Sequence, residues 1–122
     1  MKREIKFRAW NKKDKVMVDV AAMNFGPSGL WSLIEYAYDA ELQLADNYEL
    51  MQYTGLKDKN GREIYEGDVV KNEYGKVMEV QYDPRSAAFG VGDNYFGTIG
   101  SGKTLEVIGN IFENPEMMEG KQ

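Results

Sequence analysis

The sequence has no cysteine and no histidine among its 122 residues. Without cysteine, the chain can form no disulfide, no thiolate zinc site and no cysteine nucleophile. Without histidine, it lacks the usual general base near neutral pH and the commonest metal ligand. These absences exclude Ser-His-Asp and Cys-His catalysis and leave only carboxylates, Lys, Tyr and Arg for any chemistry. We therefore expect a protein that is not an enzyme and that has no cofactor and no metal site.

Long apolar runs are also absent. No run approaches the roughly 18 residues that a membrane-spanning helix needs. Residues 1–8 carry charge where a secretory signal peptide has its apolar core. Hydrophobic residues make up 43% of the sequence and charged residues 29%, which is typical of an ordinary globular protein. The sequence thus predicts a cytoplasmic protein with no membrane partner.

The net charge of −5 is distributed unevenly. Residues 1–16 carry seven bases and two acids, which gives +5, and the remaining residues carry eight bases and eighteen acids, which gives −10. A basic N-terminal segment on an acidic body favours contacts between protomers, or between the segment and its own domain. The same distribution disfavours broad nucleic-acid binding by the body.

Apolar and charged side chains alternate over residues 3–9, which is typical of a half-buried strand. Residues 11–14 then predict a turn, and the valines within residues 16–20 predict a return strand. The basic side chains with Trp10 as a stacking platform could bind nucleic acid, although a solvated outer face is the simpler interpretation. The candidate interaction residues of the N-terminal part are Lys6, Arg8, Trp10, Lys12, Lys13 and Trp31.

Residues 23–29 predict a loop, and residues 30–38 after it predict a short amphipathic helix. Ser28 is a suitable N-cap, and an apolar stripe at helical spacing follows it. Trp31 and Tyr36 fall off that stripe, and the aromatic content of the segment also suits a strand. The stripe consists of Leu30, Leu33, Ile34, Ala37 and Tyr38.

The stretch 50–70 predicts a strand, a reversal at residues 60–61, a short return strand, a second turn at residues 66–68 and another strand. The Asn-Gly pair suits a two-residue hairpin turn because glycine readily adopts the positive φ that such a turn needs. Three nearby carboxylates could pair for acid–base work, but the turn glycines favour a structural role. They belong to Glu63, Glu66 and Asp68, of which Asp68 is expected to cap the second turn.

Further short strands follow, with turns every eight to twelve residues, up to a last strand at 105–112 in which Gly109 indicates a bulge. This regular spacing predicts a small barrel, which would leave no unpaired sheet edge. The sequence therefore predicts a mainly β fold, α+β at most, in three parts. The parts are a β-hairpin extension with the short helix over 1–49, the barrel over 50–115 and a flexible tail over 116–122.

One stretch matches a phosphate-binding pattern literally. Residues 97–104, Gly-Thr-Ile-Gly-Ser-Gly-Lys-Thr, satisfy G-x-x-x-x-G-K-[ST]. That chemistry needs a helix after the loop, with its N-terminus facing the phosphate. The residues after Lys103 are instead β-branched, interrupted by Gly109 and stopped by Pro115, so they predict a strand. We interpret the motif as a flexible loop between two barrel strands and not as a nucleotide site.

Several stretches of the sequence resemble the YopX family of phage and prophage proteins. The stretches, in chain order, are Phe7-Arg8-Ala9-Trp10, then Met51-Gln52-Tyr53-Thr54-Gly55-Leu56-Lys57-Asp58 with Asn60-Gly61, then Ile64-Tyr65-Glu66-Gly67-Asp68-Val69-Val70, and finally Val107-Ile108-Gly109-Asn110-Ile111-Phe112-Glu113-Asn114-Pro115. The resemblance spans nearly the whole chain, apart from residues 19–47. It implies an SH3-like barrel, a location in the cytoplasm of a bacterial host, and no established enzymatic activity.

These observations together predict a non-enzymatic phage or prophage protein that acts as a protein-interaction module. Its expected partner is a protein, with copies of itself foremost, in a homo-oligomer that could reach a trimer or a larger assembly. The N-terminal hairpin and residues 30–38 are the candidate docking elements. The alternative is a nucleic-acid-binding accessory protein that uses the basic hairpin.

Overall fold

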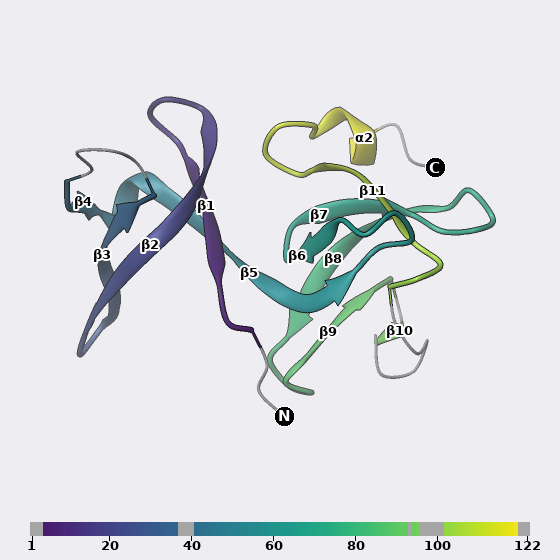
Figure 1. Cartoon of the computed structure of the whole chain (residues 1–122), viewed down its shortest axis with the longest axis horizontal. Coiled ribbons are helices and arrows are strands. Elements are labelled where there is room, and N and C mark those ends of the chain that lie inside the picture. Colours follow the sequence, from purple (N-terminus) through teal and green to yellow (C-terminus); the bar gives the residue numbers. More distant parts are fainter. Residues whose placement is uncertain (1–3, 37–40, 93, 96–101, 120–122) are drawn as a thin grey trace. The chain divides into compact units, whose positions relative to one another are not determined.

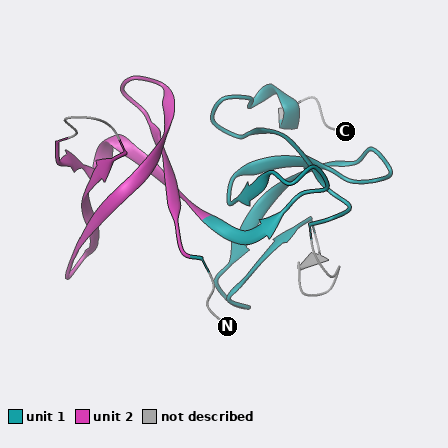
Figure 2. Ribbon diagram, in the orientation of Figure 1, with its two compact units in different colours: residues 1–4, 53–122 teal, residues 5–52 magenta. Residues whose placement is uncertain are grey.

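The computed structural model describes residues 4–36, 41–92, 94–95 and 102–119. Within these residues the chain is mostly β and antiparallel, as the sequence predicted (Figure 1). It divides into two compact units (Figure 2). Unit 2 is Ile5–Gln52, and unit 1 consists of Glu4 together with the described residues from Tyr53 onward. No helix among the described residues has the length and apolar character that crossing a membrane would take.

The strands of unit 2 pair in the order β4-β3-β2-β1-β5, and all neighbours are antiparallel. Ala9 lies directly between Val18 and Leu50 on the neighbouring strands, where the alternation of the sequence predicts an inward side chain. With the buried Leu33 and Tyr48, it forms a small apolar core on one face of the sheet. The elements are β1 (Phe7–Asn11), β2 (Val16–Gly26), β3 (Gly29–Glu35), β4 (Gln43–Leu44), the 3-10 turn η1 (Ala45–Asn47) and β5 (Tyr48–Lys57), whose second half belongs to unit 1.

The predicted N-terminal hairpin is confirmed, with different bounds. Its first strand begins at Phe7 and not at residue 3, and its second strand continues to Gly26. Residues 23–26, which were predicted as loop, are therefore strand. The longer β2 supplies the edge on which the following segment pairs.

The helix predicted over residues 30–38 is wrong, because residues 29–35 form β3 and residues 37 and 38 lie outside the described residues. The chain reverses tightly between Gly26 and Gly29, where Gly29 has a φ of 110°, and β3 then pairs with β2 on one side and β4 on the other. These ladders satisfy the backbone groups that a helix would satisfy internally. The weak helical preference of an aromatic-rich segment cannot compete with pairing on both sides.

Unit 1 contains the five-stranded sheet β10-β9-β8-β7-β11 and the hairpin of β5 with β6. In the part of the chain that is described, the pairing order of this sheet ends at β10 and β11. The elements are β6 (Glu63–Tyr65), β7 (Asp68–Lys71), β8 (Val77–Asp83), β9 (Ala88–Val91), β10 (Asn94–Tyr95), β11 (Glu106–Asn110) and α2 (Glu116–Glu119). The core residues are Ile64, Val70, Met78, Val80, Val91, Leu105 and Val107.

Both turns predicted within residues 50–70 are present. The first is longer than predicted, since residues 58–62 connect β5 to β6, but Gly61 has the expected positive φ of 84°. At the second turn Gly67 has a φ of 88°, and the carboxylate of Asp68 accepts the N–H of Tyr65 at 2.7 Å. Asp68 thus caps the turn as predicted, and its side chain is almost fully buried.

The C-terminal part follows the prediction as far as the last strand. No helix begins at Lys103; β11 follows instead, and its register with β7 shifts between Val107 and Gly109, which confirms the bulge. Residues 116–119, predicted as tail, form the single helical turn α2, which Pro115 introduces with its fixed φ. Residues 97–101 of the phosphate-loop pattern and residues 120–122 of the predicted tail lie outside the described residues.

Candidate interaction surface

The turn of the basic hairpin is held by one buried side chain, Asn11. Its Oδ1 accepts the N–H groups of Lys13 and Asp14, both at 3.0 Å, and its carbonyl accepts the N–H of Lys15 at 2.7 Å. Lys15 has a φ of 58°, the left-handed value that closes such a turn. The side chains of Lys13 and Lys15 are exposed at this turn.

The six residues predicted as an interaction surface do not form one basic patch. Arg8 and Trp10 lie on one face of β1, but each faces an acidic neighbour across the sheet, Asp19 for Arg8 and Glu49 for Trp10. The ammonium of Lys12 lies 3.6 Å from the carboxylate of Glu49. Lys6 precedes β1, Lys13 lies in the turn, and Trp31 lies on β3, with β2 between it and β1.

We expect weak binding of nucleic acid, because these carboxylates lie beside the basic side chains that would contact the phosphates. In fluorescence anisotropy at about 0.15 M salt, neither single- nor double-stranded DNA should bind at micromolar protein. The variant Lys12→Glu/Lys13→Glu should give the same curve. Tight binding that weakens steeply with salt and is lost in that variant would instead support the nucleic-acid alternative.

A polar cluster joins three strands of unit 2 at the last residues of β1 and β3 and the first residue of β5. The buried hydroxyl of Tyr48 donates a hydrogen bond to the carboxylate of Glu35 and accepts one from the side-chain amide of Asn11 at 3.4 Å. Burial raises the pKa of Tyr48 above its ordinary value, and the bond to Glu35 and its charge raise the pKa further. A phenol that holds its proton is a poor nucleophile and a poor base at neutral pH. The cluster therefore braces β1, β3 and β5.

The outer face of the β2–β3–β4 region carries apolar side chains that sequence reasoning missed. Ala22 lies opposite Ile34. Leu44 lies opposite the buried Ser32, which precedes Ile34 by two residues on β3 and therefore lies on the same face. Leu42 lies two residues before Leu44, just before β4 begins. Leu42 is 48% exposed and Leu44 57% exposed. We call Ala22, Ile34, Leu42 and Leu44 the outer apolar face.

The other face of the same strands is also apolar. Leu33, the neighbour of Ile34, is fully buried in the core, and Met23 pairs with it and packs there too. An antiparallel sheet with one face in water normally alternates apolar and polar residues, whereas a sheet that is apolar on both faces is normally covered on both. The outer apolar face therefore has the composition of a surface that another molecule covers.

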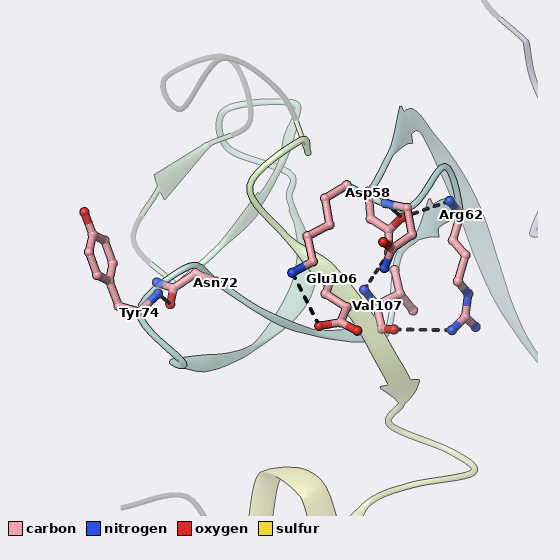
Figure 3. A network of polar contacts seen from close by, with 8 residues as sticks. Asp58, Arg62, Asn72, Tyr74, Glu106 and Val107 are labelled. Atoms are coloured by element: carbon pink, nitrogen blue, oxygen red, sulfur yellow. Dashed lines mark hydrogen bonds and ion pairs between the residues drawn. The ribbon is translucent and has the colours of Figure 1, made fainter.

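Unit 1 has a polar network within the stretch 50–70, at Asp58 (Figure 3). The side chain is 4% exposed; Oδ1 accepts the N–H groups of Asn60 at 2.8 Å and Arg62 at 2.9 Å, and Oδ2 accepts the N–H of Val107 at 2.9 Å. The guanidinium of Arg62 donates to the carbonyl of Val107 at 3.3 Å. The side chains of Asp58 and Arg62 thus form hydrogen bonds with the N–H and the carbonyl of Val107, as a neighbouring strand would.

The chemistry of Asp58 is that of a structural acceptor. Burial raises the pKa of this carboxyl, but the N–H donors of Val107, Arg62 and Asn60 and the charge of Arg62 lower it more, so that the pKa lies below its ordinary value. A general acid near neutral pH needs the opposite shift. Among the described residues, no group of three or more acidic side chains is arranged to hold a metal ion.

The glycine of the phosphate-loop pattern that the structure describes, Gly102, is buried against the backbone of β5. A Cβ atom on it would lie 2.8 Å from the carbonyl oxygen of Lys57 and 2.5 Å from Cδ1 of Ile64. Lys103, the lysine of the pattern, has an exposed side chain, and strand β11 begins three residues later. Gly102 thus serves close packing between two segments of unit 1.

A family model described as YopX protein matches residues 6–119, which is nearly the whole chain. Among solved structures, the chain is similar to the crystal structure of protein EF1440 from Enterococcus faecalis, with a TM-score of 0.69 and 29% sequence identity. That similarity covers 96% of this chain and 99% of the other, so it includes both units. No curated protein matches the chain.

Proposed function

Because this chain belongs to the YopX protein family, we propose that it is a non-enzymatic protein-interaction module of phage or prophage origin. Its binding surface is the outer apolar face of unit 2. The observation that carries the proposal is the exposure of Leu44 on β4 and of Leu42 just before it, beside the strands β2 and β3 whose opposite face already forms the core. Burial of these side chains by a partner removes apolar surface from water, which is the main driving force of protein association.

The polar clusters of both units support a non-enzymatic role. Tyr48 holds its proton, and Asp58 holds its negative charge, so neither is tuned for proton transfer near neutral pH. Both side chains are bonded to neighbouring strands or turns, which accounts for their burial without a substrate.

We propose that unit 1 is an SH3-like barrel scaffold. Three contacts support a barrel in which the segment between β5 and β6 covers the edge at β11. The carboxylate of Asp58 accepts the N–H of Val107, and the N–H of Lys59 donates to the carbonyl of Leu105 at 2.9 Å. An ion pair between Lys59 and Glu106 at 3.8 Å spans the same edge. A covered edge cannot pair with other chains.

The proposed function is tested by affinity capture from cells that carry the prophage, with the wild-type chain and the variant Leu42→Glu/Leu44→Glu as baits. We expect the variant to lose at least one protein that the wild type retains in stoichiometric amount, because two buried charges at the interface centre oppose binding. Thermal melting of the variant should stay within a few degrees of the wild type, since both side chains are exposed in the single chain.

The matched control is Ile5→Glu/Tyr74→Glu, which places two glutamates on exposed apolar residues that are not part of the outer apolar face. This control should retain the same partners as the wild type. Identical sets of captured proteins for all three baits, together with a wild-type chain that stays monomeric, would refute the proposed surface and with it the proposed function.

A further inference from the structure

The charged residues that flank the outer apolar face in the sequence are all acidic. Residues 16–56 contain no lysine and no arginine, although six acids fall within them. Glu41 immediately precedes Leu42, and Asp46 follows Leu44 by two residues. Both side chains are exposed, and within the described residues neither carboxylate has an ion-pair partner. A partner that covers this face must therefore bring positive charge beside an apolar side chain.

The turn of the N-terminal hairpin in this same chain carries positive charge beside an apolar side chain. Lys12 is paired with Glu49 in its own unit, but the ammonium groups of Lys13 and Lys15 have no carboxylate partner within the described part of the chain. Val16, directly after Lys15, is 45% exposed although it begins strand β2. The buried Asn11 fixes the backbone of this turn, so it presents these side chains at little further cost in conformational entropy.

We infer that a second copy of this chain covers the outer apolar face, with the turn formed by residues 12–16 of one copy on residues 41–46 of the other. Val16 meets the exposed leucines, and Lys13 and Lys15 meet Glu41 and Asp46. The contact joins unlike surfaces of identical chains, and its repetition closes an oligomer of two or more copies. The inference rests on the proposed function, for which it names the partner.

The test measures mass and dissociation constant for the whole chain by light scattering and sedimentation. The wild type should form a defined oligomer whose dissociation constant rises with salt, because exposed ion pairs are screened. Lys13→Glu/Lys15→Glu and, separately, Glu41→Lys/Asp46→Lys should each weaken association about 10-fold or more. The variant with all four changes should have a dissociation constant within about 3-fold of the wild-type value, because the ion pairs between the copies are restored with the charges exchanged.

The matched control is Lys76→Glu, an exposed lysine of unit 1, which changes the net charge at a residue that belongs to neither of the two segments. It should leave the dissociation constant within about 3-fold of the wild type, and all variants should melt near the wild-type temperature. A monomeric wild type at about 100 μM, equal weakening by the control, or no recovery in the fourfold variant would overturn the inference.

The two proposals fail in different ways. If the wild type is monomeric but Leu42→Glu/Leu44→Glu still loses a captured protein, the surface binds a foreign partner and only the second-copy inference is wrong. If the capture experiment shows no difference and no oligomer forms, the proposed function itself is wrong.

Discussion

Substitution of Gly102 by alanine is expected to destabilise the protein by about 2–3 kcal/mol, the cost typical of overpacking in a rigid environment. The new methyl group would lie 2.8 Å from the carbonyl oxygen of Lys57, which is backbone and cannot rotate away, and 2.5 Å from Cδ1 of Ile64. Ile64 is fully buried and has no free space to enter. Thermal unfolding followed by circular dichroism should show a melting temperature lower by roughly 8 °C.

Two other glycines provide a graded control. A Cβ on Gly109 would meet Oδ1 of Asn114 at 2.5 Å and Sδ of Met117 at 3.0 Å, and both of these atoms end flexible side chains, so Gly109→Ala should cost less. A Cβ on Gly26 would meet only Cδ1 of Trp31 at 3.5 Å, an ordinary contact. Gly26→Ala should therefore be neutral or slightly stabilising. An unchanged melting temperature for Gly102→Ala would contradict the packing role of Gly102.

Substitution of Asp58 by asparagine is expected to cost about 2–3 kcal/mol, as for a buried charged acceptor of several hydrogen bonds. The amide retains one oxygen, which can accept the N–H groups of Asn60 and Arg62, but its NH₂ group then faces the N–H of Val107. The N–H of Val107 in β11 would then face another donor and would have lost its acceptor. Chemical denaturation at pH 7 measures the loss, and the exposed control Glu73→Gln should change stability by less than about 0.5 kcal/mol.

The stability difference between wild type and Asp58→Asn should depend on pH in a defined direction. The folded pKa of Asp58 lies below its unfolded value, so the carboxylate contributes stability above the unfolded pKa. That contribution is lost as the pH falls through the unfolded value toward the folded one. The difference should therefore be full near pH 7 and should shrink below about pH 4. A difference that grows on acidification would show that the sign is wrong.

The turns could be predicted because their signals are local. Gly61 and Gly67 need positive φ whatever surrounds them, and the carboxylate of Asp68 reaches a backbone N–H only three residues away. The bond of Asp58 to Val107 joins residues 49 positions apart. Nothing in the local sequence distinguishes an aspartate that only caps its turn from one that also binds a distant strand.

The helix prediction for residues 30–38 is wrong for a physical reason that also reveals the candidate surface. Leu33 and Ile34 are adjacent, which suits a helical stripe, but in a strand adjacent side chains point to opposite faces. Leu33 enters the core and Ile34 joins the outer apolar face. A strand that is apolar on both faces loses the period of two by which strands are recognised, and only the pairing with β2 and β4 resolves the ambiguity.

The uneven distribution of charge along the chain could be predicted from the sequence, but the contacts that the charged side chains make could not. The contact of Lys12 with Glu49 depends on the pairing of β1 with β5, which are far apart in the chain. The same pairing places Glu49 opposite Trp10 and weakens the predicted basic patch. Of the six predicted surface residues, only Lys12 and Lys13 lie in the turn that we infer to contact a second copy, and of these two only Lys13 meets a carboxylate of that copy.

The central claim is that the stretch resembling the family signature is structural, with Asp58 as an ionised acceptor for β11. The most direct test is a titration of the side-chain carboxyl carbon of Asp58 by nuclear magnetic resonance, with the amide of Val107 observed in parallel. We predict a pKa below the ordinary aspartate value, or no protonation before acid unfolding, and a Val107 amide shift that moves together with the carboxyl. A carboxyl that titrates above the ordinary value, independently of Val107, would contradict the claim, because such a group is suited to proton transfer.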